Sequence, residues 1–212
     1  MTHAAHETIV VYGPSTSINV RKVLFLLALL GTPFQHFDRY IPEHFGQRPF
    51  EALNPNRLYP LLRCGDFTLW ESNSILRYLA GRFDPTLHPD NEQRRALVDQ
   101  WLDWQAADLN PAWRYAYQAL VKKHPDYGDP AAIARSQSQW DRLTALLADH
   151  LAANGPYAAG DFFSIADIAL LLSINRWRHT KRITAEDSPF AAYLAAARDL
   201  PGYRRYVDNG QP

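Results

Sequence analysis

The sequence predicts two domains, an α/β domain followed by an all-α domain. Short β-branched and aromatic runs alternate with helical patterns over residues 1–84, whereas residues 91–212 contain helical patterns alone. Between them, residues 85–90 are a polar stretch interrupted by proline, which is typical of a linker. A chain of 212 residues is long enough to bury a core in both domains.

The first domain begins with a strand, a helix and a second strand. Residues 8–12 form a β-branched, aromatic run that ends at a Gly-Pro pair, which predicts a buried strand. Residues 17–30 carry apolar side chains at helical spacing, and residues 34–39 predict the second strand. The segment 41–50 is irregular, and one helical turn is expected around residues 49–53.

The second half of this domain predicts a hairpin and a helix. Residues 59–63 and 67–70 are short apolar runs, and the turn between them is expected to contain Cys64. A helix is expected over residues 72–82. The resulting βαβ-ββα order is thioredoxin-like.

The second domain is predicted to be helical throughout. One helix start is well marked, because Ser164 can act as N-cap and Asp167 as its capping-box partner. The helix that follows is apolar nearly all round over residues 168–174, so it is expected at the centre of this domain. Helices are expected over residues 91–122, 130–153, 164–178, 188–198 and 201–208.

Composition excludes several classes of function. The chain has 22 Lys plus Arg and 22 Asp plus Glu, so charge gives no reason to expect a nucleic acid or an anionic membrane as partner. The first residues lack the pattern of a signal peptide and no apolar run is long enough to span a bilayer, so a cytoplasmic protein is expected. The single cysteine cannot form an internal disulfide. The histidines, including His3 and His6, form no metal-ligand grouping, so no metal is expected.

Three segments of the first domain are candidates for chemistry. They are the turn before the first helix with Ser17, the strand start with Pro60, and the Glu71-Ser72 pair. Taken singly, these residues favour structural roles as helix caps or an edge-strand proline. The alternative is binding, because backbone N–H groups and the dipole at a helix N-terminus favour an anion, including a thiolate.

In combination the segments resemble the cytosolic glutathione transferases, and the resemblance covers nearly the whole chain. Residues 17–23 are similar to the family's S-x-N-x-x-K-V stretch, Pro60 matches its cis-proline, and Glu71-Ser72 matches its acidic-serine pair. The capping box at residues 164–167 matches the family's signature in the helical domain. The sequence is most similar in character to bacterial theta-, beta- and nu-like members of the serine type.

The resemblance implies a thiol activator in the first loop. Ser17 corresponds to the activating serine, four residues before Arg21. Asn19 is a further candidate, since nu-like members use an asparagine here, and Ser15 and Tyr12 remain alternatives.

The resemblance also implies how glutathione is held. The Glu71-Ser72 pair is expected to bind its γ-glutamyl end, and the backbone of Tyr59, before Pro60, its cysteinyl part. Two positions depart from the family pattern, because Arg57 stands where many relatives have glycine and Tyr59 where they have valine or isoleucine. Arg57 is either a ligand of the glycyl carboxylate or a solvated surface residue, and His44 is a weaker candidate for that carboxylate.

The all-α domain is expected to contribute the electrophile site. Core packing is the simpler interpretation of the aromatic residues after position 91, but in the family this helix lines the electrophile pocket. The resemblance therefore implies an aromatic wall that accepts apolar or aromatic electrophiles, built from Tyr12, Trp104, Trp113 and Tyr115.

The implied function is conjugation of the glutathione thiolate to small hydrophobic electrophiles, in detoxification. Glutathione is the co-substrate, no metal is needed, and a homodimer is expected by analogy. Two alternatives remain open at this point. One is a nu-like disulfide or peroxide reductase that depends on Asn19, and the other is a non-catalytic binding module of the same fold.

Overall fold

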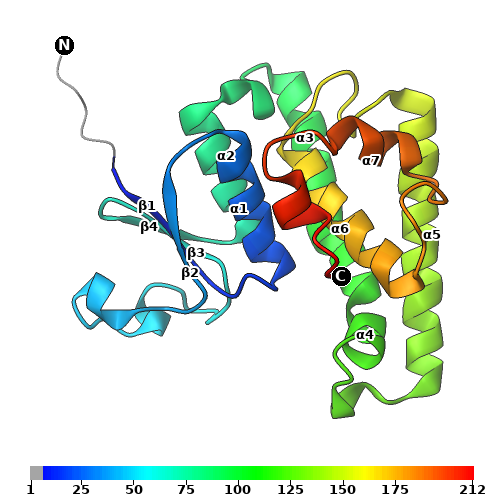
Figure 1. Cartoon of the computed structure of the whole chain (residues 1–212), viewed down its shortest axis with the longest axis horizontal. Helices are drawn as coiled ribbons and strands as arrows, with labels where there is room; N and C mark the ends of the chain where they lie inside the picture. The colour runs from blue at the N-terminus through cyan, green and yellow to red at the C-terminus, as the bar shows by residue number, and fades with distance from the viewer. Residues whose placement is uncertain (1–6) are drawn as a thin grey trace.

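The computed structural model describes residues 7–212 and contains a sheet domain beside a helical domain (Figure 1). The sheet has four strands, β1 (Ile9–Tyr12), β2 (Phe34–Phe37), β3 (Leu61–Cys64) and β4 (Phe67–Trp70), in the order β2-β1-β3-β4. β1 pairs with β2 in parallel, and the other two pairings are antiparallel. This arrangement confirms the predicted βαβ-ββα domain.

The central strand β1 is buried on both faces. Ile9 and Val11 pack into the main core together with α1 (Ile18–Leu29) and α2 (Ser72–Phe83). On the opposite face Val10 and Tyr12 belong to a smaller cluster, which includes Leu53 and side chains from the segment after β2. The strand is therefore apolar at every position, because each face of the sheet has its own cover.

The remaining chain is helical, as predicted. The 3-10 turns are η1 (Pro42–Phe45), η2 (Phe50–Ala52), η3 (Pro85–Leu87) and η5 (Pro125–Tyr127). The other segments are α3 (Glu92–Trp104), the π-helical turn η4 (Gln105–Leu109), α4 (Asn110–Leu120), α5 (Pro130–Asn154), α6 (Ile165–Lys181), α7 (Ala191–Ala197) and the π-helical turn η6 (Tyr203–Val207). None of the helices within residues 7–212 combines the length and the apolar character needed to cross a bilayer.

Helix α6 forms the centre of the second domain, and its capping box is confirmed. The Asp167 carboxylate accepts hydrogen bonds from the backbone N–H of Ser164 at 2.8 Å and from that of Ala158 at 2.9 Å. The Ser164 hydroxyl and the Tyr193 hydroxyl also donate to it, at 2.9 and 2.8 Å. Burial raises the pKa of Asp167 although these hydrogen bonds act in the opposite direction. A fully buried carboxylate thus holds the start of α6 in place.

Two details differ from the sequence predictions. The helix expected over residues 91–122 is interrupted by η4, where the side chain of Gln105 turns into a buried polar network. Cys64 does not lie in the hairpin turn but ends β3, where it is only 2% exposed. Its pairing with Phe67 leaves Gly65 and Asp66 as the turn.

Candidate active site

Three loops meet at one edge of the sheet. Tyr12, Leu61 and Trp70 lie side by side in the strand register, and β1 and β4 run in the same direction. The loop after β1, the residue before β3 and the residue after β4 therefore share this edge. Both α1 and α2 begin there, so the register brings together the three segments that the sequence singled out.

Gly13 allows the first loop to approach the loop before β3. Its φ is +137°, a region that favours glycine. A Cβ atom at this position would lie 2.7 Å from Cβ of Tyr59 and 2.6 Å from Cγ2 of Val20, which is too close for any side chain. The glycine therefore sets the contact between the loop that carries Ser17 and the residue before Pro60.

The start of α1 leaves polar groups unused. Ser17 occupies the N-cap position, and its backbone N–H donates to the carbonyl of Pro14 at 2.9 Å. Its hydroxyl makes no capping hydrogen bond. Nearby, Oδ1 of Asn19 is buried and has no hydrogen-bond partner among the described residues. Unsatisfied polar groups of this kind are rare in a folded protein, and they are expected where a ligand binds.

The second loop has the backbone that the resemblance implies. The peptide bond between Tyr59 and Pro60 is cis. The Tyr59 hydroxyl accepts the backbone N–H of Tyr40 at 3.0 Å, and its ring packs on Phe50 with 5.0 Å between ring centroids. The ring is thus held against the segment after β2. Asn54 supports the loop by donating to the carbonyl of Leu58 at 2.6 Å, a role that sequence reasoning missed.

The third loop carries an unusual backbone conformation. Glu71 has φ +71° although it is not glycine, and it caps α2 with no side-chain hydrogen bond. Such conformations cost free energy and cluster at functional sites. Ser72, the next residue, is buried, and its Oγ accepts a long hydrogen bond of 3.5 Å from Nζ of Lys22.

Lys22 joins this edge to the second domain. Its Nζ also donates to Oδ1 of Asn73 at 3.1 Å and to Oε1 of Gln105 at 2.9 Å. The pKa of Lys22 is lowered to about 7, mainly by burial and also by the charge of Arg176, whereas Glu71 opposes the shift. No role was predicted for Lys22. Its burial could have been inferred from the sequence, because Lys22 stands in a helix whose residues are apolar on nearly every side.

The candidates for the glycyl carboxylate differ in availability. Arg57 has φ +54°, so it adopts the conformation expected at a glycine position, and its guanidinium pairs with Glu51 at 3.1 Å on the surface. His44 is bonded through Nδ1 to the hydroxyl of Tyr12 at 2.8 Å. Ser15, an alternative candidate for thiol activation, donates its backbone N–H to the carboxylate of Asp38 at 2.8 Å.

The prediction that Tyr12 contacts the electrophile is wrong. Its side chain is 0% exposed and stacks on Phe37 on the face of the sheet away from α1. Burial raises the pKa of Tyr12. A buried phenol that is bonded to His44 can neither line an open pocket nor serve as the thiol activator.

The other predicted aromatic residues do not form a common wall. Trp104 packs edge-on against Trp101, and Tyr115 packs against Tyr127 near the start of α5. Trp113 is buried and donates from Nε1 to Oδ1 of Asn110 at 3.1 Å. The family resemblance grouped these residues in one wall, but Trp104 ends α3, Trp113 and Tyr115 lie in α4, and the rings contact different neighbours, so the single wall is a wrong prediction. Only Trp113 contacts a side chain at the junction of the domains, that of Arg176.

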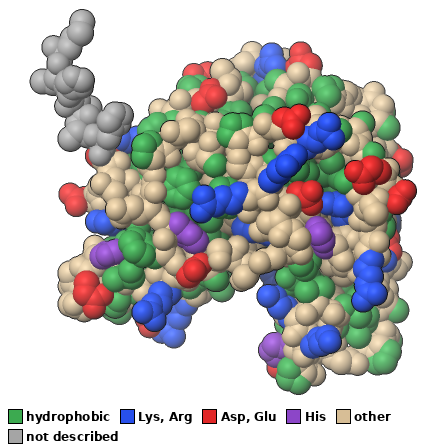
Figure 2. Space-filling model, viewed as in Figure 1, with side chains coloured by type: hydrophobic (Ala, Val, Ile, Leu, Met, Phe, Trp, Pro, Cys, Tyr) green, Lys and Arg blue, Asp and Glu red, His purple; other side chains and the backbone are tan. Residues whose placement is uncertain are grey.

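A cleft lies between the two domains. The space-filling view shows a deep notch at the lower edge, between the part of the sheet domain that follows β2 and the end of α4 (Figure 2). The first turn of α1 and the end of the chain lie above this notch in Figure 1. Arg21, in that turn, donates to Oδ1 of Asn209 at 2.8 Å, which ties the chain's last residues to α1.

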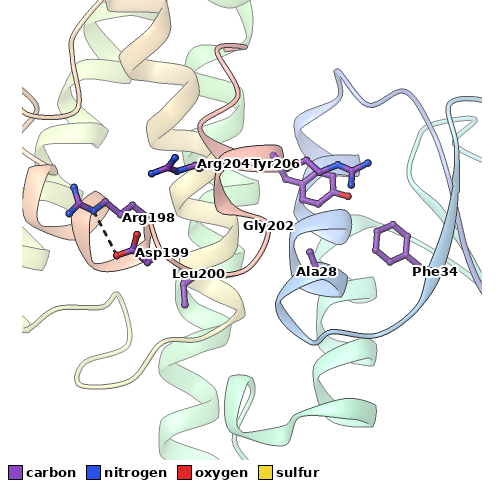
Figure 3. A pocket seen from close by; sticks show the side chains of 9 residues that line it. Ala28, Phe34, Arg198, Asp199, Leu200, Gly202, Arg204 and Tyr206 are labelled. Carbon is purple, nitrogen blue, oxygen red and sulfur yellow. Dashed lines mark ion pairs between the residues drawn. The ribbon is translucent and has the colours of Figure 1, made fainter.

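A separate hollow of about 570 Å³ lies beside the C-terminal segment (Figure 3). Phe34 and Tyr206 border it near Ala28, and the ion pair of Arg198 with Asp199 lies at its far end. It contains none of the residues that the sequence singled out for catalysis or binding.

Other reactive groups contribute no chemistry here. Cys64 donates to the carboxylate of Glu7 at 3.5 Å, and burial raises the pKa of its thiol, so the nucleophilic thiolate is disfavoured. Over residues 7–212 there is no group of three or more His, Cys, Asp or Glu side chains arranged to hold a metal ion. His3 and His6 lie outside the described residues.

The fold and the three loops define a class of protein, in which a thioredoxin-like first domain is followed by an all-helical second domain. The family model "Glutathione S-transferase, N-terminal domain" matches residues 16–82. The glutathione S-transferase GstB of Escherichia coli K12 is 39% identical over 168 residues, which are 76% of this chain and 79% of that protein. The glutathione S-transferase-like protein tpcF of Aspergillus fumigatus is 32% identical, over 95% of this chain and 90% of its own.

Solved structures agree with these relatives. The theta class glutathione S-transferase of Xanthomonas axonopodis pv. citri, solved with glutathione bound, superposes with a TM-score of 0.83. It is 33% identical, and the match covers 95% of this chain and 97% of that one. The chain therefore belongs to the glutathione S-transferase family.

Proposed function

We propose that this protein conjugates the thiolate of glutathione to small hydrophobic electrophiles. One observation carries the proposal: α1 and α2 begin at the same edge of the sheet, and neither start is capped by a side chain. Backbone N–H groups and helix dipoles at such starts favour bound anions. The names of the relatives support transfer rather than disulfide reduction or a purely structural role.

Glutathione would lie across the three loops. The Glu71-Ser72 pair would receive its γ-glutamyl end, and the backbone of Tyr59 beside Pro60 would pair with its cysteinyl part as an added strand. Arg57 would take the glycyl carboxylate after leaving Glu51, an exposed partner that holds it weakly. His44 is the poorer candidate, because its Nδ1 is already bonded to Tyr12.

Thiol activation would come from Ser17, with Asn19 as the other candidate. The free Ser17 hydroxyl can donate to the thiolate, and together with the helix start it would lower the thiol pKa from about 8.5 to about 6.5. The thiol proton passes to solvent, sulfur forms a bond to the electrophilic carbon, and the leaving group departs with its electron pair. The unpartnered Oδ1 of Asn19 supports its presence in the same pocket.

Calorimetry and kinetics test this proposal. Titration with glutathione should show binding at millimolar concentration or below, and turnover of 1-chloro-2,4-dinitrobenzene should fall strongly in Ser17→Ala. If glutathione fails to bind, the proposed function is wrong. If Ser17→Ala keeps full turnover while Asn19→Ala loses it, Asn19 is the activator.

Three further expectations concern the roles of the two domains, the location of the protein in the cell and its oligomeric state. Residues 1–84 would bind glutathione, residues 85–90 would link the domains, and residues 91–212 would contribute the electrophile side. We propose that the protein is a cytoplasmic detoxification enzyme and a homodimer that joins the first domain of one chain to the second domain of the other. Leu58, 65% exposed on the loop before β3, is suited to such a contact. Light scattering of the wild type and of Leu58→Asp tests the dimer.

A further inference from the structure

Three buried cations meet where α1 packs against α6. Arg21 and Lys22 are neighbours in α1, and Arg176 lies in the second half of α6. Their exposed fractions are 0%, 1% and 4%. Charged side chains are almost never this buried unless an opposite charge accompanies them.

Within residues 7–212 no Asp or Glu side chain forms an ion pair with any of the three, and a guanidinium nitrogen of Arg21 lies 3.5 Å from the oxygen of Pro212. Lys22 is bonded to neutral side-chain oxygens, and Arg21 to an amide oxygen and backbone carbonyls of the last residues. Arg176 lies over the rings of Trp113 and Tyr117, at 4.5 and 4.1 Å from their centroids. The Nε atoms of Arg21 and Arg176 are buried and lack a hydrogen-bond partner within residues 7–212.

The cations also act on one another. The pKa of Arg176 is lowered to about 10, mainly by burial, with Tyr117 opposing the shift and the charge of Arg21 contributing to it. Arg176 in turn lowers the pKa of Lys22. Glu71 is the acidic residue that opposes this effect on Lys22, and it lies on the glutathione side. The positive charge therefore remains uncompensated on the side of Arg176.

The two ends of the cluster contact different parts of the molecule. Lys22 contacts Ser72, so it belongs to the glutathione side. Arg176 contacts Trp113, on the helix that borders the cleft opposite the sheet domain (Figures 1 and 2). A low-dielectric wall with charges of one sign raises the local concentration of the opposite charge in a cleft.

We propose that Arg176 makes the enzyme selective for electrophiles that carry a carboxylate on an aromatic ring. This inference rests on the proposed function and names the substrate class of the same site. The guanidinium of Arg176, whose buried Nε has no hydrogen-bond partner within residues 7–212, supplies a positive charge for the carboxylate, and Trp113 and Tyr117 beside it supply apolar neighbours for an aromatic body. Arg176 is a specificity-determining residue and takes no part in forming the carbon–sulfur bond.

A matched pair of substrates tests the proposal. 4-Chloro-3-nitrobenzoate and 4-chloro-3-nitrobenzamide undergo the same reaction, in which a carbon–sulfur bond forms, the carbon–chlorine bond breaks and chloride leaves. After division by the uncatalysed rates, kcat/KM for the benzoate should exceed that for the amide by about tenfold or more. In Arg176→Met this preference should disappear through a higher KM for the benzoate, with kcat nearly unchanged.

A control variant distinguishes the effect of removing the charge of Arg176 from the effect of removing a positive charge elsewhere on the protein. Arg135 is an exposed arginine of α5 that lies close to Asp129, and Arg135→Met should keep the benzoate preference. Equal kcat/KM for the two substrates in the wild type, with both converted, would overturn the inference while the proposed function stands. An equal loss of the benzoate preference in Arg176→Met and in Arg135→Met would overturn the inference as well.

A binding measurement decides the case if Arg176→Met does not fold or if no conjugation occurs. With glutathione present, the wild type should bind the unreactive 3-nitrobenzoate about tenfold more tightly than 3-nitrobenzamide. Equal affinity, or no binding of either compound, would overturn the inference. Absence of glutathione binding itself would count against the proposed function instead.

Discussion

Two kinds of helix start can be compared in this molecule. At α6, Asp167 and Ser164 satisfy the helix start with buried hydrogen bonds, and the caps Asn91 of α3 and Asp129 of α5 each accept a backbone N–H. At α1 and α2 the residues in the same position, Ser17 and Glu71, make no such bond. The sequence motifs look alike in the two cases. The difference is that the side chains of Ser17 and Glu71 are not used in capping, whereas those of Asp167, Asn91 and Asp129 are used within the fold.

Asp167→Ala should give the largest effect on stability. It leaves the N–H groups of Ala158 and Ser164 and the hydroxyl of Tyr193 without their buried acceptor, so we expect a loss of about 3 kcal/mol or more in the free energy of unfolding. Urea denaturation measures it. The control Asn91→Ala removes one exposed cap and should cost only about 1 kcal/mol. Equal losses would mean that burial adds nothing to the α6 cap.

Lys22→Met should change how stability depends on pH. The pKa of Lys22 is about 7 in the folded protein and about 10.5 when unfolded, so between these values the unfolded chain binds the extra proton. Wild-type stability should therefore rise with pH above 7, by up to about 1.4 kcal/mol per pH unit. The slope should be absent below pH 7, where both states are protonated.

Urea denaturation of the wild type and the variant between about pH 6 and about pH 9.5 gives the difference in how steeply the free energy of unfolding changes with pH. Lys122→Met, at an exposed lysine, should keep the wild-type slope. A Lys22→Met variant with an unchanged slope would show that Lys22 is charged throughout this range.

Much of the fold followed from the sequence, because hydrophobic period and turn residues determine it locally. The strands and helices fall where alternation and helical spacing predicted them, and the buried capping box of α6 was visible as a motif. The π-helical turn at Gln105 was not predictable, since its cause is a partner 83 positions away, Lys22. A local pattern carries no information about such a partner.

The candidate site was predictable in part for the same reason. Pro60, Glu71 and Ser72 occupy loops whose order along the chain fixes their place at one edge of the sheet. The aromatic wall, which the family resemblance implied, failed because tertiary packing decides which neighbour each ring contacts: Trp104 packs on Trp101 and Tyr115 on Tyr127. The burial of Arg176 depends on rings from another helix, those of Trp113 and Tyr117 in α4, and a single sequence does not record such contacts.

Glu71→Gly tests whether the backbone at the start of α2 is held for binding. Glycine adopts φ +71° without steric cost, so the free energy of unfolding should rise by about 0.5–1 kcal/mol. Glutathione affinity should fall about tenfold with the loss of the carboxylate. Lys123→Gly, at φ +52° and remote from the sheet edge, should give a similar stabilisation with unchanged affinity. Loss of affinity in both would point to a general change in the fold.

Ser17→Ala should give the smallest change in stability, and it tests the comparison most directly. The hydroxyl makes no capping hydrogen bond, so the free energy of unfolding should change by less than about 0.5 kcal/mol, whereas Asp129→Ala should cost about 1 kcal/mol. Turnover with 1-chloro-2,4-dinitrobenzene should fall about 10- to 100-fold in Ser17→Ala alone. Suppose instead that Ser17→Ala destabilises the protein as much as Asp129→Ala and keeps its turnover. Ser17 would then be an ordinary cap, and the start of α1 would belong with that of α6, because the free hydroxyl is what separates the two.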